Sequence, residues 1–167
     1  MVFKALGRVE GQSRVDLIDL ISEDAILPML RSHSKKQVLQ DLSERAGEVC
    51  LLSPRLVFET VLARERLGTT GIGHGIAIPH GKITGLDRIR GVFGRLIKPV
   101  DFEALDDQPV DLVFLLLAPE AAGAEHLKAL SKIARFIRDP GTVDELRAAR
   151  DVADIKRLML EAASPAR

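Results

Sequence analysis

The chain has 167 residues, and 46% of them are hydrophobic, which allows a buried core and excludes a wholly disordered chain. Its 24 basic and 24 acidic residues balance, which argues against a protein that binds nucleic acid or a membrane surface through excess positive charge. The single cysteine, Cys50, cannot form an internal disulfide. The sequence shows no signal peptide, and its longest apolar run, 112–118, is too short to span a membrane. We therefore expect a cytoplasmic protein without a membrane span.

Capping residues and hydrophobic periodicity predict alternating helices and strands. Ser34 and Gln37 form a capping box that begins a helix, and Gly47 is its predicted stop. Ser53 followed by Pro54 begins a second helix in the same way. The predicted elements are, in chain order, an extension over 1–14, helices over 34–46 and 53–67, a glycine-rich loop over 68–75, strands over 76–78 and 91–97, a turn at 106–109, a strand over 112–118, a loop over 119–123, helices over 124–138, from 139 onward and over 154–162, and a tail over 164–167.

The strand over 112–118 is nearly all apolar, as is typical of a central strand that is buried on both faces. Predicted helices flank a small set of strands on both sides in the sequence. We therefore predict an α/β fold, a three-layer sandwich in which helices cover both faces of a mixed sheet, formed by one domain over 15–163.

His80 is the first candidate for chemistry, because it lies between Pro79 and Gly81, directly after a short strand and beside the glycine-rich loop. Proline restricts the backbone before the imidazole, and glycine leaves space after it. This setting suits a rigid ring that another molecule approaches closely. The alternative is a loop histidine without a role.

His126 is the second candidate, in the first turn of the predicted helix over 124–138. At 100° per residue, its side chain shares an apolar stripe with Leu130, Ile133 and Ile137. The free N–H groups at this end of a helix favour an anion and disfavour an imidazolium. An inward, neutral histidine here could help to receive an anion; the alternative is a core histidine bonded to a carbonyl group.

Arg64 is the third candidate, because it shares a helix face with Val57 and Val61, whereas Arg66 is rotated away from it. A guanidinium that points inward needs an anionic partner, since its desolvation is costly. Together with the two histidines and the glycine-rich loop, Arg64 predicts a phosphate site. The alternatives are a structural ion pair, or an arginine whose stem packs while its head reaches water.

Other familiar site patterns do not fit the sequence. The glycines over 71–78 lack the third glycine of a dinucleotide-binding fingerprint, and the segment over 75–82 departs from P-loop spacing. His74, His80 and His126 lack the local spacing of zinc ligands, so we expect no metal site.

The segments over 71–82, 102–112 and 125–127 resemble IIA proteins of the fructose/mannitol type in the bacterial phosphotransferase system. The resemblance extends over about 15–162, and the glycine-rich string that ends in Ile-Pro-His-Gly-Lys is closer to the nitrogen-regulatory branch. His74 departs from the pattern, since close relatives usually carry asparagine there.

The resemblance implies a role for each candidate. His80 would be the phosphorylated residue, His126 the second active-site histidine, and Arg64 the arginine that screens phosphoryl charge. It also implies a mixed sheet flanked by helices and an HPr-like phosphocarrier as the donor. Phosphorylation would control binding to regulatory target proteins, without a metal or an organic cofactor.

Two alternatives stay open. The chain shows no IIB or membrane segment, which favours the nitrogen-regulatory branch. A free-standing sugar-specific IIA protein stays possible, because such subunits can be encoded separately, and it would pass the phosphoryl group to a IIB component. The helices over 34–46 and 53–67 also allow a helix-turn-helix DNA-binding regulator. The connection between them is longer than usual for that motif, and the second helix is not conspicuously basic.

Overall fold

A mixed sheet of six strands lies at the centre of the computed structural model, which describes residues 16–162. The strands are β1 (Ile26–Leu30), β2 (Gly71–Gly73), β3 (Ile76–Ala77), β4 (His80–Ile83), β5 (Arg90–Val100) and β6 (Val110–Pro119). Their order is β1-β5-β6-β3-β2, and β4 also pairs with β6. The pairs β5–β6 and β2–β3 are antiparallel and the other pairs are parallel. The extension predicted over 1–14 and the tail predicted over 164–167 lie outside the described residues.

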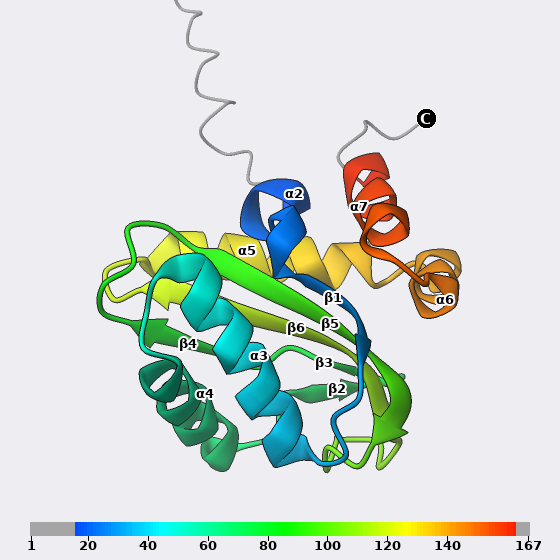
Figure 1. The fold of residues 1–167 in the computed structure, drawn as a ribbon, viewed down its shortest axis with the longest axis horizontal. Coiled ribbons are helices and arrows are strands. Elements are labelled where there is room, and N and C mark those ends of the chain that lie inside the picture. The colour runs from blue at the N-terminus through cyan, green and yellow to red at the C-terminus, as the bar shows by residue number, and fades with distance from the viewer. Residues whose placement is uncertain (1–15, 163–167) are drawn as a thin grey trace, which may run out of the picture.

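Helices cover both faces of this sheet, so the predicted three-layer α/β sandwich is confirmed. The helices are α2 (Leu17–Leu20), α3 (Lys35–Cys50), α4 (Pro54–Leu67), α5 (Gly123–Phe136), α6 (Pro140–Ala148) and α7 (Val152–Glu161), with a short 3₁₀ helix η1 (Glu23–Ala25). In Figure 1, α3 and α4 lie in front of the sheet, where they contact β5 and β4, and α5 lies behind it against β6. Within the described residues, no helix has the length and apolar character needed to cross a membrane.

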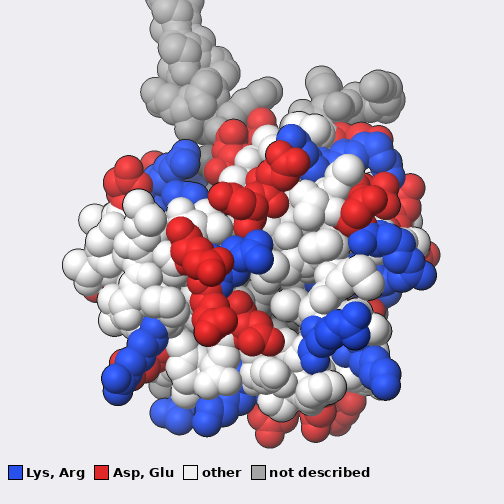
Figure 2. Space-filling model, in the orientation of Figure 1, with Lys and Arg blue, Asp and Glu red and all other residues white. Residues whose placement is uncertain are grey.

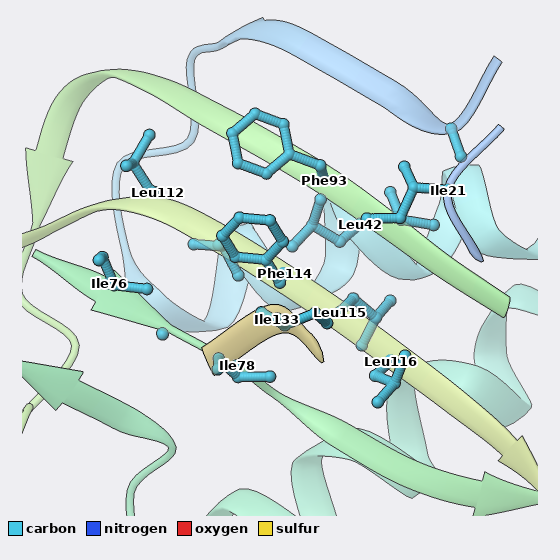
Figure 3. Close-up of a cluster of buried hydrophobic side chains, with 14 of the residues drawn as sticks. Ile21, Leu42, Ile76, Ile78, Phe93, Leu112, Phe114, Leu115, Leu116 and Ile133 are labelled. Atoms are coloured by element: carbon cyan, nitrogen blue, oxygen red, sulfur yellow. The ribbon is translucent and has the colours of Figure 1, made fainter. Parts of the chain in front are cut away.

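The core is centred on β5 and β6. Phe93 and Phe114 lie opposite each other in register, with ring centroids 4.8 Å apart (Figure 3). Phe114 also contacts Phe136 of α5 edge to face. Every residue over 112–118 is buried, as the sequence predicted for a central strand. The surface seen in Figure 2 carries basic and acidic side chains side by side, as expected from a balanced charge.

The predicted helix starts are confirmed by their caps. The Ser34 hydroxyl accepts a hydrogen bond from the backbone N–H of Gln37, and the Ser53 hydroxyl accepts one from Leu56. The carboxylate of Asp139 accepts one from Gly141 at the start of α6. These local interactions need no distant partner, which is why the sequence reveals them.

The segment over 68–75 is predicted to be a loop, but part of it is a strand. Gly71–Gly73 forms β2 and pairs with β3. His74 and Gly75 make the hairpin turn with φ of 57° and 80°. A strand with two glycines among its three residues has little intrinsic strand propensity. Backbone pairing with β3 across the two-residue turn therefore stabilises this strand.

Gly47 does not end the first long helix, because α3 continues to Cys50 and closes at Leu51 with φ of 59°. A Cβ atom on Gly47 would lie 2.7 Å from Pro54 Cγ and 2.8 Å from the Leu52 carbonyl oxygen. The glycine is therefore explained by the close approach of the connection to α4 and not by a helix stop.

Replacing Gly47 with alanine is expected to lower the free energy of unfolding by about 1–2 kcal/mol, because overpacking against backbone outweighs the better helix propensity of alanine. Gly141→Ala in α6 is the matched control, since its Cβ would meet no atom closer than 3.7 Å. Urea unfolding measures both variants. A Gly47→Ala variant as stable as wild type would contradict the close approach.

Candidate functional site

His80 begins β4, which continues the line of β3 along the central strand β6. Ile76 lies opposite Leu112 and His80 lies opposite Leu116, so both short strands share one register. Pro79 between them has no N–H group, yet its carbonyl oxygen accepts a hydrogen bond of 2.9 Å from Leu116. His80 is therefore anchored in the sheet as the first residue of β4, whereas the sequence placed it just after a strand over 76–78.

The backbone of the same segment holds the His80 ring. The distance from His80 Nδ1 to the Ile78 carbonyl oxygen is 2.8 Å. A carbonyl oxygen only accepts, so Nδ1 carries the proton of the neutral ring and Nε2 carries the lone pair. The side chain is half-buried, which leaves part of it accessible to a partner.

His126 lies beside His80, as the sequence hypothesis required. The two ring centroids are 5.5 Å apart, and the rings meet edge to face at 83°. His126 is 8% exposed, and among the described residues its Nε2 has no hydrogen-bond partner. Within the described part of the chain, no carbonyl group bonds to this nitrogen, so the alternative of a core histidine bonded to a carbonyl group is not seen at Nε2. A buried polar atom without a protein partner is rare, and either a bound water or a ligand atom can supply the missing bond.

The fold brings the start of α5 to the same edge of the sheet. Residues 120–122 connect the end of β6 to α5, and β4 runs parallel to β6 toward that end. No side chain caps the helix at Ala122. The free N–H groups of the first turn of α5 therefore add partial positive charge near the two histidines.

Burial, followed by the charges of His80 and Lys82, holds the pKa of His126 below its ordinary value. Each of these causes disfavours the imidazolium form. His126 is thus a neutral ring at neutral pH and adds no positive charge of its own to the site.

Stability is expected to fall as the pH decreases below about 6.5, the ordinary pKa of histidine, because the unfolded chain takes up a proton that folded His126 resists. The slope for one such proton approaches about 1.4 kcal/mol per pH unit, down to the lowered folded pKa. His126→Phe removes this titration, so its unfolding free energy should depend less steeply on pH in urea unfolding between about pH 5 and 7. Equal slopes in both proteins would contradict the lowered pKa.

Arg64 is half-buried near the end of α4, and Arg66 is exposed. Arg64 Nη1 donates a hydrogen bond of 2.8 Å to the Gly68 carbonyl oxygen. Arg64 forms no ion pair with another residue of the described range 16–162. One turn earlier, Thr60 faces Gly81 of β4, so this side of α4 lies against the strand that carries His80.

Glu65 is the charged side chain that α4 buries most deeply, and the sequence reasoning missed it. The buried residues of α4 are Val57, Val61 and Glu65. Arg64, which was predicted to share the face of the two valines, lies at its edge. The i, i+4, i+8 spacing of the three buried residues is the signal that could have identified Glu65.

The Glu65 carboxylate is fully satisfied. It accepts hydrogen bonds from the backbone N–H (3.0 Å) and the hydroxyl of Thr70, and it lies 2.9 Å from Lys35 Nζ. Burial alone would raise the pKa of Glu65, but the bonds from Thr70 and Lys35 outweigh it and hold the pKa below its ordinary value. Glu65 is therefore a buried anion that fixes the segment after α4.

His74 lies away from the other two histidines, in the turn between β2 and β3. Its backbone N–H donates to Asp106 and its carbonyl oxygen accepts from Arg147. Over residues 16–162 there is no group of three His, Cys, Asp or Glu side chains that could hold a metal ion.

Known proteins resemble the chain over nearly its whole length. The family described as "Phosphoenolpyruvate-dependent sugar phosphotransferase system, EIIA 2" matches residues 19–162. A nitrogen regulatory protein of Bradyrhizobium diazoefficiens is 56% identical, over 83% of this chain and 91% of its own length. A fructose-specific EIIA component of Haloferax volcanii is 32% identical, over 89% of this chain and 94% of its own. The crystal structure of nitrogen regulatory protein IIA-Ntr from Neisseria meningitidis matches with a TM-score of 0.80 and 35% sequence identity. The match covers 84% of this chain and 97% of the Neisseria chain.

Proposed function

Because the chain belongs to the EIIA 2 family of the phosphoenolpyruvate-dependent sugar phosphotransferase system, we propose that it accepts a phosphoryl group on His80 as a nitrogen-regulatory IIA protein. The family resemblance expected from the sequence is confirmed, and so is its nitrogen-regulatory branch. One observation carries the phosphoryl proposal. The lone pair of His80 Nε2 and the Nε2 of His126, which has no partner within the described part of the chain, belong to two rings that meet edge to face in one site.

The proposed donor is an HPr-like phosphocarrier that carries its own phosphohistidine. His80 Nε2 attacks the phosphorus atom in line, a new N–P bond forms, and the N–P bond to the carrier breaks. The electron pair of the broken bond returns to the imidazole of the carrier. As His80 becomes positively charged, its Nδ1–H bond to the Ile78 carbonyl oxygen strengthens and stabilises the product.

We assign His126 the role of hydrogen-bond donor to a phosphoryl oxygen. With its proton on Nε2, the neutral ring can donate a hydrogen bond to that oxygen. The oxygen would then be the partner that Nε2 lacks among the described residues. A donor that is already in place costs no rearrangement at the transition state, where charge on the transferred oxygens has to be stabilised.

Arg64 is assigned to screening the same charge. A guanidinium has five N–H donors, and among the described residues the only hydrogen bond of the Arg64 side chain is the one from Nη1 to the Gly68 carbonyl oxygen. The remaining donors are suited to phosphoryl oxygens, and the free N–H groups at the start of α5 add to the positive potential.

Phosphorylation is proposed to switch the binding of regulatory target proteins. A phosphoryl group on hydroxyl side chains adds about −1.5 to −2 charges at neutral pH. A comparable change at the half-buried His80 would reverse the local potential. A target that recognises this surface could then distinguish the two states.

The proposal is tested by incubating the protein with phosphoenolpyruvate and a purified HPr-like phosphocarrier system, followed by mass spectrometry of the intact chain and its peptides. We expect one phosphoryl group per chain, bound to His80 and lost in acid, as is typical of an N–P bond. No modification, or modification at another residue, would overturn the assignment.

A sugar-specific role is the second candidate, favoured by the similarity to a fructose-specific EIIA component. Incubation of the phosphorylated protein with a fructose- or mannitol-type IIB domain distinguishes the two roles. A nitrogen-regulatory protein should keep its phosphoryl group, whereas rapid transfer to IIB would support the sugar-specific role.

A further inference from the structure

A buried carboxylate outside the histidine pair is connected to His80 by a series of hydrogen bonds, which the backbones of Thr70 and Ile78 join. Its first link is Glu65, which accepts both the backbone N–H and the hydroxyl of Thr70. Thr70 is buried, and it lies in the short segment between α4 and β2, outside any helix or strand. Glu65 therefore holds a residue that regular secondary structure does not hold.

The next two links run through Ile78. The Thr70 carbonyl oxygen accepts a hydrogen bond of 2.9 Å from the Ile78 N–H, and the Ile78 carbonyl oxygen lies 2.8 Å from His80 Nδ1. Ile78 and Pro79 lie between β3 and β4. The Pro79 carbonyl oxygen bonds to Leu116 of β6, whereas the two backbone groups of Ile78 bond to Thr70 and to His80.

We propose that Glu65 is a positioning residue for His80, and that it acts through the backbones of Thr70 and Ile78. The inference rests on the proposed function of His80 as the phosphoryl acceptor. Glu65 fixes Thr70, Thr70 fixes the Ile78 backbone, and the Ile78 carbonyl oxygen keeps the proton on Nδ1 of His80. The lone pair of His80 thereby stays on Nε2.

An anion is needed at position 65, because every hydrogen-bond or ion-pair partner of its carboxylate in the described structure is a donor. The Thr70 N–H, the Thr70 hydroxyl and the Lys35 ammonium all converge on the carboxylate. A glutamine of the same shape would have to turn its NH₂ group toward one of these donors. The expected result is displacement of Thr70, which then reaches Ile78 and the His80 ring.

The exposed Glu103 provides a matched control for the loss of one negative charge. Its carboxylate lies 3.3 Å from the same Lys35 Nζ, but its side chain is 76% exposed and makes no bond to Thr70. Glu103→Gln therefore removes a carboxylate beside Lys35 and leaves the link to His80 intact.

The test compares Glu65→Gln, Glu103→Gln and wild type by two measurements. The ¹⁵N chemical shifts of the unphosphorylated His80 ring report its tautomer, and phosphoramidate, a small N-phosphoryl donor, reports the reactivity of Nε2 without a docking partner. For Glu65→Gln we expect a mixed tautomer and a rate lowered by about 10-fold, since misplacement of a reacting group by about 1 Å can cost up to about 100-fold. Glu103→Gln should match wild type in both measurements. A Glu65→Gln variant with the wild-type tautomer and rate would overturn the proposal.

A second pair of variants keeps the test decisive if Glu65→Gln does not fold. Thr70→Val removes the hydroxyl at nearly constant shape and should shift the tautomer of His80, whereas Thr70→Ser keeps the hydroxyl and should restore it. Equal tautomers in the valine and serine variants would also overturn the proposal. If wild type is not phosphorylated at all, the proposed function fails, but the ¹⁵N comparison still decides whether Glu65 positions the ring.

Discussion

Replacing His80 with alanine is expected to abolish phosphorylation of the chain by the phosphocarrier. His80 has its proton fixed on Nδ1, so it presents a lone pair on Nε2 from a half-buried ring. His126 is a poorer acceptor, because its ring is 8% exposed whereas that of His80 is half-buried. Intact-mass spectrometry after incubation with phosphoenolpyruvate and the carrier system should show only the unmodified chain.

His33→Ala is the control for the loss of a histidine elsewhere. His33 is exposed beside the start of α3, and only its backbone N–H contributes to the cap, through Gln37. This variant should be phosphorylated to one group per chain at the wild-type rate. Full phosphorylation of His80→Ala would show that the acceptor is another residue, while loss in both variants would indicate a defect in the assay.

The histidine pair could be proposed from the sequence because its signals are local. Proline and glycine around His80 mark a constrained backbone, and helical periodicity turns His126 inward; the structure has both features. The sequence reveals neither the hydrogen bond from His80 to Ile78 nor the contact between the two rings. Both depend on the register of β4 along β6, which is a tertiary interaction.

The choice between Arg64 and Glu65 shows where helical periodicity is insufficient. With Val57 placed at 0° around the helix axis and about 100° per residue, Val57 and Val61 define a stripe centred at about 20°. Arg64 and Glu65 lie about 40° and 60° from that centre. The angles alone favour Arg64. The structure buries Glu65, because Thr70 and Lys35 provide three donors for its carboxylate, and neither is part of α4.

The missed strand β1 has a different cause. Pro28 lies in its middle, and proline argues against a central strand. However, within residues 16–162 β1 is an edge strand that pairs with β5 alone, where a missing N–H group is tolerated. The Pro28 carbonyl oxygen in turn accepts a hydrogen bond from the buried Arg95 of β5. Its place at the edge could not be predicted, because β5 lies far away in the sequence.

Replacing His126 with phenylalanine is expected to slow phosphoryl transfer to His80 by about 100-fold, or roughly 2.7 kcal/mol, the effect of removing one preorganised donor to a developing oxyanion. Phenylalanine keeps an aromatic ring edge to face with His80 but has no nitrogen to donate to a phosphoryl oxygen. The reaction should still modify His80, since the nucleophile and its bond to Ile78 are unchanged. Rapid-quench measurements with increasing concentrations of the phosphorylated carrier provide the rate constant.

The concentration dependence distinguishes the two possible roles of His126. If its donor acts at the transition state, His126→Phe lowers the limiting rate and leaves the half-saturating carrier concentration unchanged. If His126 only shapes the docking surface, the half-saturating concentration rises at a constant limiting rate. The phosphoramidate reaction gives an independent answer, because no carrier docks in it, and it should slow by a similar factor. A wild-type rate with phosphoramidate would contradict the assignment of His126 Nε2 to a phosphoryl oxygen.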